Sequence, residues 1–380
     1  MADEQKNIPT VGSKPVAVPS HKNSKFVFFK KLFGSVPIEE RVNFARHLSF
    51  AIKSGIPVIE SLKLIQDQSS SKKLGKIINQ VINDVNNGQF LAQSLEKFDY
   101  IFGDLFINMV RVGETSGNLS ETLLHLSKEI KKQREINNRI KSAFVYPSII
   151  LCATIGMTVF LTTVIFPKIL PIFSNLKVGL PFTTRAVIAI LNFLNHYGIV
   201  FLGGVILVFV LFQIALMFKP IRYVWDKLML ALPIVSKMIK NLTMANFTRS
   251  LGILLKSGMT VVDGLAISKN TVRNKIYQFH IEKIIETVRQ GESLAHYLKK
   301  APKLFPKMFL GMIKVGEETG NLEENLTYLS EYYSEELDNT VKNLTTLLEP
   351  ILILLMGLVV GFIALSIIMP IYSITQGISG

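Results

Sequence analysis

Residues 145–166 read VYPSIILCATIGMTVFLTTVIF, a run without Asp, Glu, Lys or Arg. Two further runs share this character, Gly198 to Phe218 and Ile351 to Met369. About 20 helical residues are enough to cross the roughly 30 Å hydrocarbon core of a bilayer. The sequence therefore predicts a polytopic membrane protein with three transmembrane helices, which we assign to 145–167, 198–218 and 350–370.

The composition of the 380-residue chain agrees with a membrane protein. Hydrophobic residues make up 49% of it, and the mean hydropathy is +0.36. The net charge of +14 would suit either nucleic acid or an anionic membrane surface. The single cysteine, Cys152, excludes an intramolecular disulfide and a cysteine metal site.

The distribution of Lys and Arg predicts the orientation. Residues 1–142 hold 21 of them and residues 219–349 hold 18, whereas residues 168–197 hold three and residues 371–380 hold none. Positively charged segments stay in the cytoplasm. We therefore expect a cytoplasmic N-terminus, an extracytoplasmic C-terminus and positive charge that faces anionic lipid. No aromatic and basic strand pattern of an RNA-binding fold occurs, so nucleic acid is not an expected partner.

These counts divide the chain into segments. Residues 1–25 are polar, contain three prolines and lack the apolar core of a signal peptide. The expected segments are a disordered basic tail (1–38), two cytoplasmic domains (39–142 and 219–349), an extracytoplasmic loop (168–197) and an extracytoplasmic tail (371–380).

The two predicted cytoplasmic domains are copies of one unit. Residues 41–147 align without gaps with residues 244–350 at a constant offset of 203, and 32 of the 107 aligned positions are identical. Chance would give only a few identities, so we interpret the pattern as an internal duplication of one domain and the transmembrane helix after it.

Each unit is predicted to be all-α. In residues 41–54 the apolar side chains recur at helical spacing, and Gly55 stands where that helix would end. Sustained period-two alternation, which is typical of strands, is nearly lacking. We expect two bundles of about six helices each.

The sharpest motif is VGETSGNL at 112–119, repeated as VGEETGNL at 315–322. Gly117 and Gly320 are expected to adopt positive φ in a tight turn. Asn118 and Asn321 are expected to cap the helices that follow them, with Glu121 and Glu324 completing capping boxes. The candidate interaction or structural residues are Gly113, Glu114, Gly117, Asn118, Gly316, Glu317, Gly320 and Asn321.

The two glutamates of this motif have two interpretations that the sequence leaves open. Glu114 and Glu317 either pair with a nearby Arg or cap a helix, or they contact a partner protein or an ion. Pro147 and Pro350, at the starts of their spans, are candidate junctions between bundle and membrane. A proline there either kinks an incoming helix or simply occupies a first turn.

The sequence contains no motif for phosphate-binding loops, HExxH zinc sites or Gly-x-Ser-x-Gly nucleophiles. We therefore expect no enzymatic activity, no cofactor and no metal. Transporters usually carry ionisable residues inside their spans. The three spans have no Asp, Glu, Lys or Arg, which disfavours the alternative of a small-molecule transporter or channel built on a repeat.

The combination of motifs resembles a known family. The matching features are Phe44-x-Arg46 and Phe247-x-Arg249, Lys-Ser-Gly at 53–55 and 256–258, the two Val-Gly-Glu turns, and the prolines at 147, 167, 350 and 370. Over residues 39–375 the chain is similar to the platform family of type IV pili (PilC) and type II secretion (GspF). One departure is Gly103, where the family usually has proline.

The resemblance implies a function and partners. Family members lie in the bacterial inner membrane, contact a hexameric assembly ATPase, guide pilin or pseudopilin subunits, meet alignment-complex membrane proteins and form homo-oligomers. We therefore expect a non-enzymatic platform that couples the ATPase to pilin insertion and extraction.

Overall fold

The computed structural model describes residues 36–165, 167–168 and 182–378. Within those residues the secondary structure is helical and no strand occurs, so the all-α prediction is confirmed. Most of the predicted N-terminal tail and part of the predicted loop lie outside the described residues. The last residues assigned to the tail are ordered: Val36 is buried in a core, and the first helix begins at Ile38.

The first lobe (residues 36–143) is a helical bundle that packs around aromatic side chains. Phe102 lies between two further rings, with centroids 5.7 Å from Phe44 and 4.9 Å from Phe106. Burial of such side chains stabilises the bundle by about 1.5–3 kcal/mol each. Its helices are α2 (Ile38–Lys53), α3 (Val58–Gln68), α4 (Lys72–Asn86), α5 (Leu91–Glu96), α6 (Asp99–Phe102), α7 (Asp104–Thr115) and α8 (Leu119–Ala143).

The second lobe (residues 233–343) repeats this bundle around Phe247, Phe305 and Phe309. Its helices are α13 (Pro233–Lys256), α14 (Val261–Thr271), α15 (Lys275–Arg289), α16 (Leu294–Leu298), α17 (Lys307–Thr319) and the first part of α18 (Leu322–Ile378). The short α6 of the first lobe was not predicted, and it ends at Gly103 with φ of 80°. The second copy has Pro306 at that position, and proline cannot adopt positive φ.

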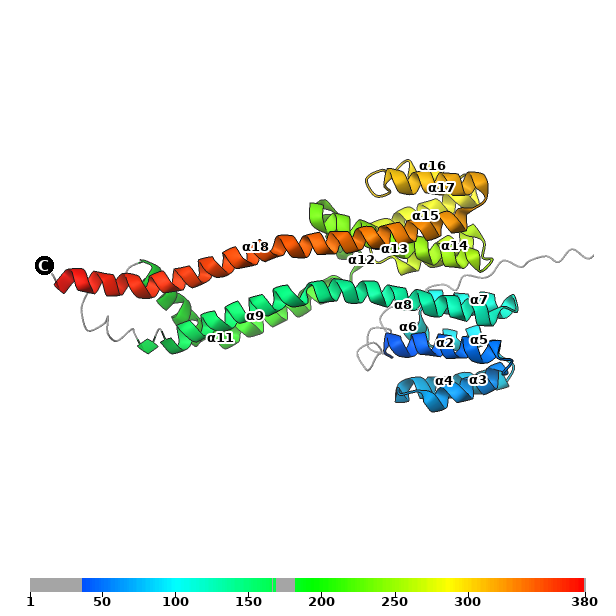
Figure 1. The fold of residues 1–380 in the computed structure, drawn as a ribbon, viewed down its shortest axis with the longest axis horizontal. Helices are drawn as coiled ribbons and strands as arrows, with labels where there is room; N and C mark the ends of the chain where they lie inside the picture. The colour runs from blue at the N-terminus through cyan, green and yellow to red at the C-terminus, as the bar shows by residue number, and fades with distance from the viewer. Residues whose placement is uncertain (1–35, 166, 169–181, 379–380) are drawn as a thin grey trace, which may run out of the picture.

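Each lobe continues into a long helical rod. The first rod consists of α8, α9 (Val145–Phe160) and the π-helix η1 (Leu161–Ile165), and the second rod is α18. At about 1.5 Å per residue the 57 residues of α18 extend about 85 Å, far more than a bilayer needs. Figure 1 shows the lobes together at one end of both rods.

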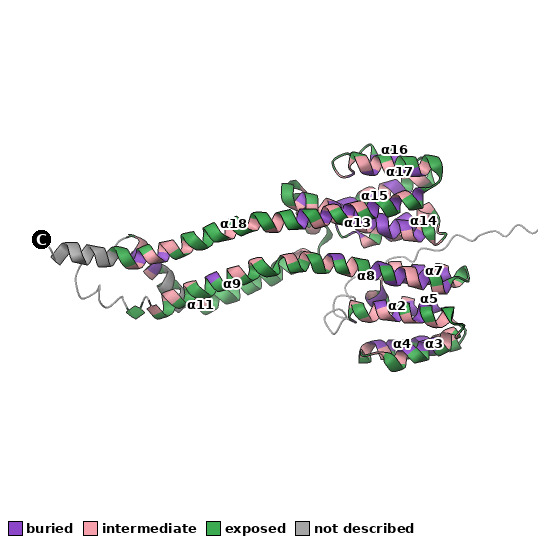
Figure 2. Ribbon diagram, viewed as in Figure 1, coloured by how far each residue is buried: buried purple, intermediate pink, exposed green. Residues whose placement is uncertain are grey.

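Three helices of the described part are long and apolar enough to cross a membrane, which confirms the predicted number. They are Leu119–Ile165, His196–Ala215 within α11 (Phe182–Ala215), and Leu322–Met369. Figure 2 shows that buried residues gather in the lobes, whereas the apolar parts of the rods are largely exposed. Exposed apolar surface of this length is what a lipid environment accommodates.

The observed helices differ in extent from the segments assigned by hydropathy. α11 begins at Phe182, so residues 182–197 of the predicted loop are helical rather than looped. Hydropathy cannot detect this extension because its residues are too polar for a spanning segment. The side chain of Thr184 attaches it to α18 by donating to the carbonyl oxygen of Ser366 at 2.8 Å.

A separate helix, α12 (Lys219–Ala231), joins α11 to the second lobe. α12 and α13 meet at a bend of 110°. Phe247 and Leu251 of α13 are buried in the second core, so α13 belongs to the lobe and the pair is not a further span.

The lobes contact each other directly. Leu254 of the second lobe is buried in the core of the first. Asn270 donates from Nδ2 to Oδ2 of Asp104 at 2.8 Å. Near the membrane-facing ends of the lobes a separate apolar cluster joins the two rods, formed by Ile136, Leu337 and Val341.

Candidate functional site

The glutamates of the repeated motif reach across each lobe to the start of a short helix. Glu114 on α7 accepts hydrogen bonds from the backbone N–H of Leu91 at 2.6 Å and of Ala92 at 3.0 Å. Both donors belong to the first turn of α5.

The second copy repeats this geometry. Glu317 accepts from the backbone N–H groups of Leu294 and Ala295 at 2.5 and 3.0 Å, at the start of α16. The first N–H groups of a helix have no partner within it, and negative charge is favourable at that end. The sequence left open whether Glu114 and Glu317 cap a helix or contact a partner. In the structure both carboxylates make a helix-capping contact.

Gly113 and Gly316 permit a close approach of two helices. A Cβ atom on Gly113 would lie 2.9 Å from Cβ of Thr122, and one on Gly316 would lie 2.9 Å from Cα of Leu322. The neighbouring atom belongs to the start of the next helix in each case. Because glycine has no Cβ, these two positions allow α7 to pack closely against α8 and α17 against α18.

The turn glycines adopt the expected conformation, with φ of 72° at Gly117 and 73° at Gly320. The prediction that the side chain of Asn118 caps the following helix is wrong. Its side chain caps no backbone N–H and instead donates to Oε2 of Glu121 at 2.6 Å. Its φ and ψ of −112° and 43° lie outside the extended region from which N-cap side chains usually reach back. In the second copy the carbonyl oxygen of Asn321 accepts from Asn325.

The two prolines occupy different environments. Pro147 lies in the first turn of α9, which Phe144 separates from α8, whereas Pro350 lies within the continuous α18. Next to them, the hydroxyl of Tyr146 and Oε1 of Glu349 are 3.4 Å apart. Tyr146 and Glu349 are equivalent positions of the two copies, so the two rods approach each other at the same point of the repeat.

A buried ion pair joins the two lobes, a few helical turns from Tyr146 and Glu349 along the rods. Nε of Arg249 on α13 lies 3.7 Å from Oε2 of Glu129 on α8, and the two side chains are 7% and 10% exposed. Arg249 also donates from Nη2 to Oγ of Ser334 on α18 at 2.6 Å. Burial raises the pKa of Glu129 to about 7, while the positive charges of Arg249 and Lys132 act against this rise.

Exposed ion pairs continue this connection toward the membrane. Lys132 lies 3.7 Å from Glu331, and Arg139 pairs with Asp338. We call the set of Glu129, Arg249, these two pairs and the cluster around Ile136 the inter-lobe joint.

The sequence does not predict the inter-lobe joint. Arg249 was visible as part of the repeated Asn-Phe-x-Arg motif, but its partner was not. Glu129 stands in a highly charged run, Lys-Glu-Ile-Lys-Lys-Gln-Arg-Glu at 128–135, where a buried acid cannot be distinguished from exposed ones.

The architecture defines a class of protein. It is a duplicated helical membrane protein in which each lobe continues into a membrane-spanning rod. Among the described residues no cluster of His, Cys, Asp and Glu is arranged to hold a metal ion.

Comparison with known proteins identifies the family. The family model "Type II secretion system (T2SS), protein F" matches residues 44–167 and 247–370. The chain is 32% identical to the type IV pilus assembly protein PilC of Thermus thermophilus, over 88% of this chain and 82% of that one. It is 30% identical to the type II secretion system protein F of Vibrio cholerae, over 86% and 80%. For the corresponding Pseudomonas aeruginosa protein the identity is 29%, over 87% and 82%.

The chain therefore belongs to the type II secretion system protein F and PilC family, as its motifs predicted. The three apolar helices and these relatives make it an inner-membrane protein of secretion or pilus machinery.

Proposed function

We propose that the chain is the platform that couples a cytoplasmic assembly ATPase to the insertion and extraction of pilin or pseudopilin subunits. In this proposal both lobes are cytoplasmic, the C-terminus is extracytoplasmic, and the chain itself has no catalytic activity. Its partners are the hexameric ATPase, the pilin, the alignment-complex membrane proteins and further copies of the chain.

The observation that carries the proposal is the continuity between lobes and membrane. The second rod is one unbroken helix from Leu322 to Ile378, and the first rod runs from Leu119 to Ile165 with a change of helix at Phe144. A continuous helix transmits a displacement along its axis, which a flexible linker does not. A motor that moves a lobe would therefore move the attached span.

The inter-lobe joint supports movement of the two rods as a unit. Removing one partner of a buried ion pair costs about 3–5 kcal/mol, whereas replacing both with apolar residues is often neutral. Burial raises the pKa of Glu129 to about 7, so the lobes are held in one relative position by the buried contacts of Glu129 and Arg249 together with the apolar cluster around Ile136, and not by ionic attraction alone. Force on one lobe then reaches both spans.

The matched control for this joint comes from the repeat. Arg46 is the counterpart of Arg249 but is exposed and donates to Asn43 instead. Each variant is compared with the wild type at an equal amount of the protein in the membrane. We expect Arg249→Met to lower fibre assembly or secretion strongly and Arg46→Met to leave it near the wild-type value. The double variant Glu129→Leu with Arg249→Met should recover part of the loss. Equal effects of both single substitutions would contradict coupling through the joint.

The orientation has its own test. Single cysteines at exposed Lys72 and Lys299, in a Cys152→Ser background, should react with a membrane-impermeant maleimide only after spheroplasts are permeabilised. Labelling of either lobe in intact spheroplasts would place it out of reach of a cytoplasmic ATPase. Co-purification of the extracted chain with a hexameric ATPase and a pilin would test the partners directly.

A further inference from the structure

The two lobes contact each other through two different surfaces. The second lobe contributes the end of α13 together with α14, and the first lobe contributes α7. Leu254 is buried in the core of the first lobe, and Oγ of Ser257 donates to Sδ of Met109 at 3.7 Å. At the edge of this contact Asn270 of α14 donates to Asp104 of α7. A contact between unlike surfaces is heterologous, or head to tail.

The duplication gives each lobe both kinds of surface, but the chain uses only one of each. In the first lobe the positions equivalent to α13 and α14 lie on α2 and α3, and in the second lobe those equivalent to α7 lie on α17. We call these surfaces the α3 face and the α17 face. Phe50 and Leu64 of the α3 face are 52% and 47% exposed, and Val315 of the α17 face is 47% exposed. Figure 1 shows α3 and α17 on opposite outer sides of the paired lobes, so the two faces do not meet within one chain.

Both free faces keep the apolar character of the contact that the chain already makes. On the α3 face, Phe50 and Leu64 replace two isoleucines of the second lobe that pack against the core of the first. On the α17 face, Met312 stands where α7 has Met109, and Val315 continues the same face one turn later. Exposed apolar surface of this kind marks a protein contact.

The charges at the edges of the two free faces are complementary. Asp67 holds the position equivalent to Asn270, and Lys307 holds the position equivalent to Asp104. Both side chains are exposed, and neither has an ion-pair partner among the described residues. If the α3 face met an α17 face as α14 meets α7, the hydrogen bond between Asn270 and Asp104 would be replaced by an ion pair. Opposite charges placed in this way fix the register of an interface.

The rods allow the contact to repeat within one membrane. Figure 1 shows that both rods leave the paired lobes in the same direction, so the movement that carries the first lobe onto the second keeps every span in the membrane.

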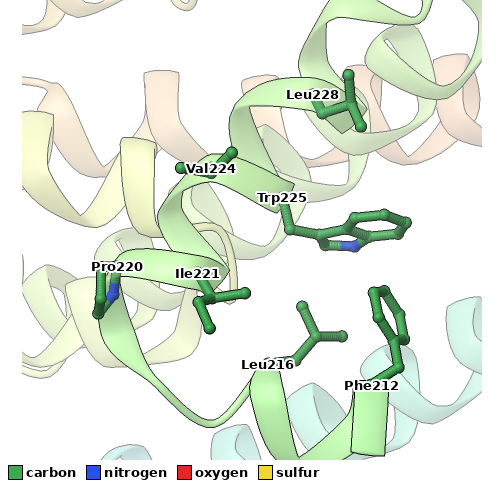
Figure 3. A pocket seen from close by; sticks show the side chains of 7 residues that line it. All are labelled: Phe212, Leu216, Pro220, Ile221, Val224, Trp225 and Leu228. Atoms are coloured by element: carbon green, nitrogen blue, oxygen red, sulfur yellow. The ribbon is translucent and has the colours of Figure 1, made fainter. Parts of the chain in front are cut away.

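The connection from the middle span does not occupy the α17 face. α12 is attached to α11 by the rings of Phe212 and Trp225, whose centroids are 5.0 Å apart (Figure 3). It is attached to the second lobe at α15, where Asp226 accepts from the backbone N–H of Lys275 at 2.7 Å. Both contacts leave α17 open to a neighbouring molecule.

We propose that copies of this chain associate head to tail, with the α3 face of one copy on the α17 face of the next. The association rests on the proposed function only in that further copies of the chain are among the partners. Each added copy brings one free face of each kind, so the contact propagates and forms a ring where the rotation closes. Arg46 contributes little to it, because Tyr332 stands in place of the Glu129 that Arg249 meets.

Cross-linking of two differently tagged copies tests the contact. In a Cys152→Ser background one copy carries Asp67→Cys and the other Lys307→Cys, and a short bis-maleimide is added to membranes of cells that lack the ATPase and the pilin. We expect a linked species with both tags from the mixture and none from either variant alone. Asp104→Cys with Asn270→Cys in one copy is the positive control for reach, read by mass spectrometry of the linked peptides. A linked control without the mixed species would overturn the proposal, as would a dimer linked through Asp67→Cys alone.

Charge reversal distinguishes a lost contact from a misfolded chain. We expect Asp67→Lys in both copies to lower their co-purification in detergent about tenfold, and Asp67→Lys with Lys307→Asp to restore it. Lys299→Asp makes the same charge change as Lys307→Asp at an exposed position outside the α17 face, and should leave co-purification unchanged. A loss that the double variant does not restore would refute the head-to-tail contact. Neither measurement involves the ATPase or the pilin, so such a result would leave the proposed coupling standing.

Discussion

Replacing Glu317 with Gln tests whether the carboxylate of the repeated Gly-Glu motif acts as a helix cap across the lobe. The substitution keeps the size of the side chain and one acceptor oxygen. It removes the negative charge, and the new side-chain NH₂ group faces a backbone N–H group that also donates. The structure predicts that the start of α16 then opens more often, at Leu294 and Ala295.

The expected magnitude follows from the contacts that are lost. A hydrogen bond to a charged group contributes about 1.5–3 kcal/mol, and negative charge at a helix N-terminus adds about 0.3–1 kcal/mol. The α16 side-chain cap by Ser293, which accepts from His296 at 3.1 Å, remains. We therefore expect a net loss of about 2 kcal/mol, which corresponds to roughly 30-fold faster exchange through local opening.

Amide hydrogen exchange of the full chain in detergent micelles measures this directly. Glu318→Gln is the matched control, because the neighbouring carboxylate is exposed and lies 3.5 Å from Lys314. An exposed pair of this kind contributes at most about 0.5 kcal/mol. Peptides that cover α16 should exchange faster in Glu317→Gln and at the wild-type rate in Glu318→Gln.

One result would refute the capping argument. If α16 exchanged at the same rate in wild type and Glu317→Gln, the carboxylate would contribute nothing to the helix. A loss of fibre assembly in that same variant would then favour a direct contact with a partner protein.

Three further predictions concern stability of the full chain in micelles, measured by thermal unfolding. Gly316→Ala should destabilise the second lobe by about 1–3 kcal/mol through overpacking, whereas Gly311→Ala on the same helix has open space and should be neutral or stabilising; equal melting temperatures would contradict this. Gly103→Pro should destabilise the first lobe although the second copy has proline there, because its φ of 80° is closed to proline; an unchanged melting temperature would count against the described turn. Burial raises the pKa of Glu129 from 4.5 to about 7, so the neutral carboxyl contributes stability that is fully present below pH 4.5 and is lost as the pH rises through about 7. Glu129→Gln should flatten the melting temperature over this pH range, and a profile identical to that of the wild type would show that another group titrates there.

The sequence predicted the features that depend on local pattern. The three spans follow from uncharged runs of sufficient length, and the duplication follows from the constant offset. The positive φ of Gly117 and Gly320 follows from the turn between two helical patterns. For the spans and the turns, the residues that decide the structure are neighbours along the chain, whereas the duplication is found by comparing two distant segments of the sequence.

The features that were not predicted depend on contacts across the chain. The target of Glu114 lies 23 residues away, so a capping role could be considered but its helix could not be named. Glu129 and Arg249 are brought together by the packing of two lobes. The early start of α11 depends on the contact of Thr184 with α18, which hydropathy does not report.

The buried pair also explains an advantage of fusing two copies in one polypeptide. In an association of two identical subunits, symmetry would duplicate every contact, and two charged pairs would have to be desolvated. Here Tyr332 occupies the place equivalent to Glu129, and Arg46 stays at the surface. Covalent linkage has let the halves diverge, so that one central electrostatic contact serves where a homodimer would require a pair of them.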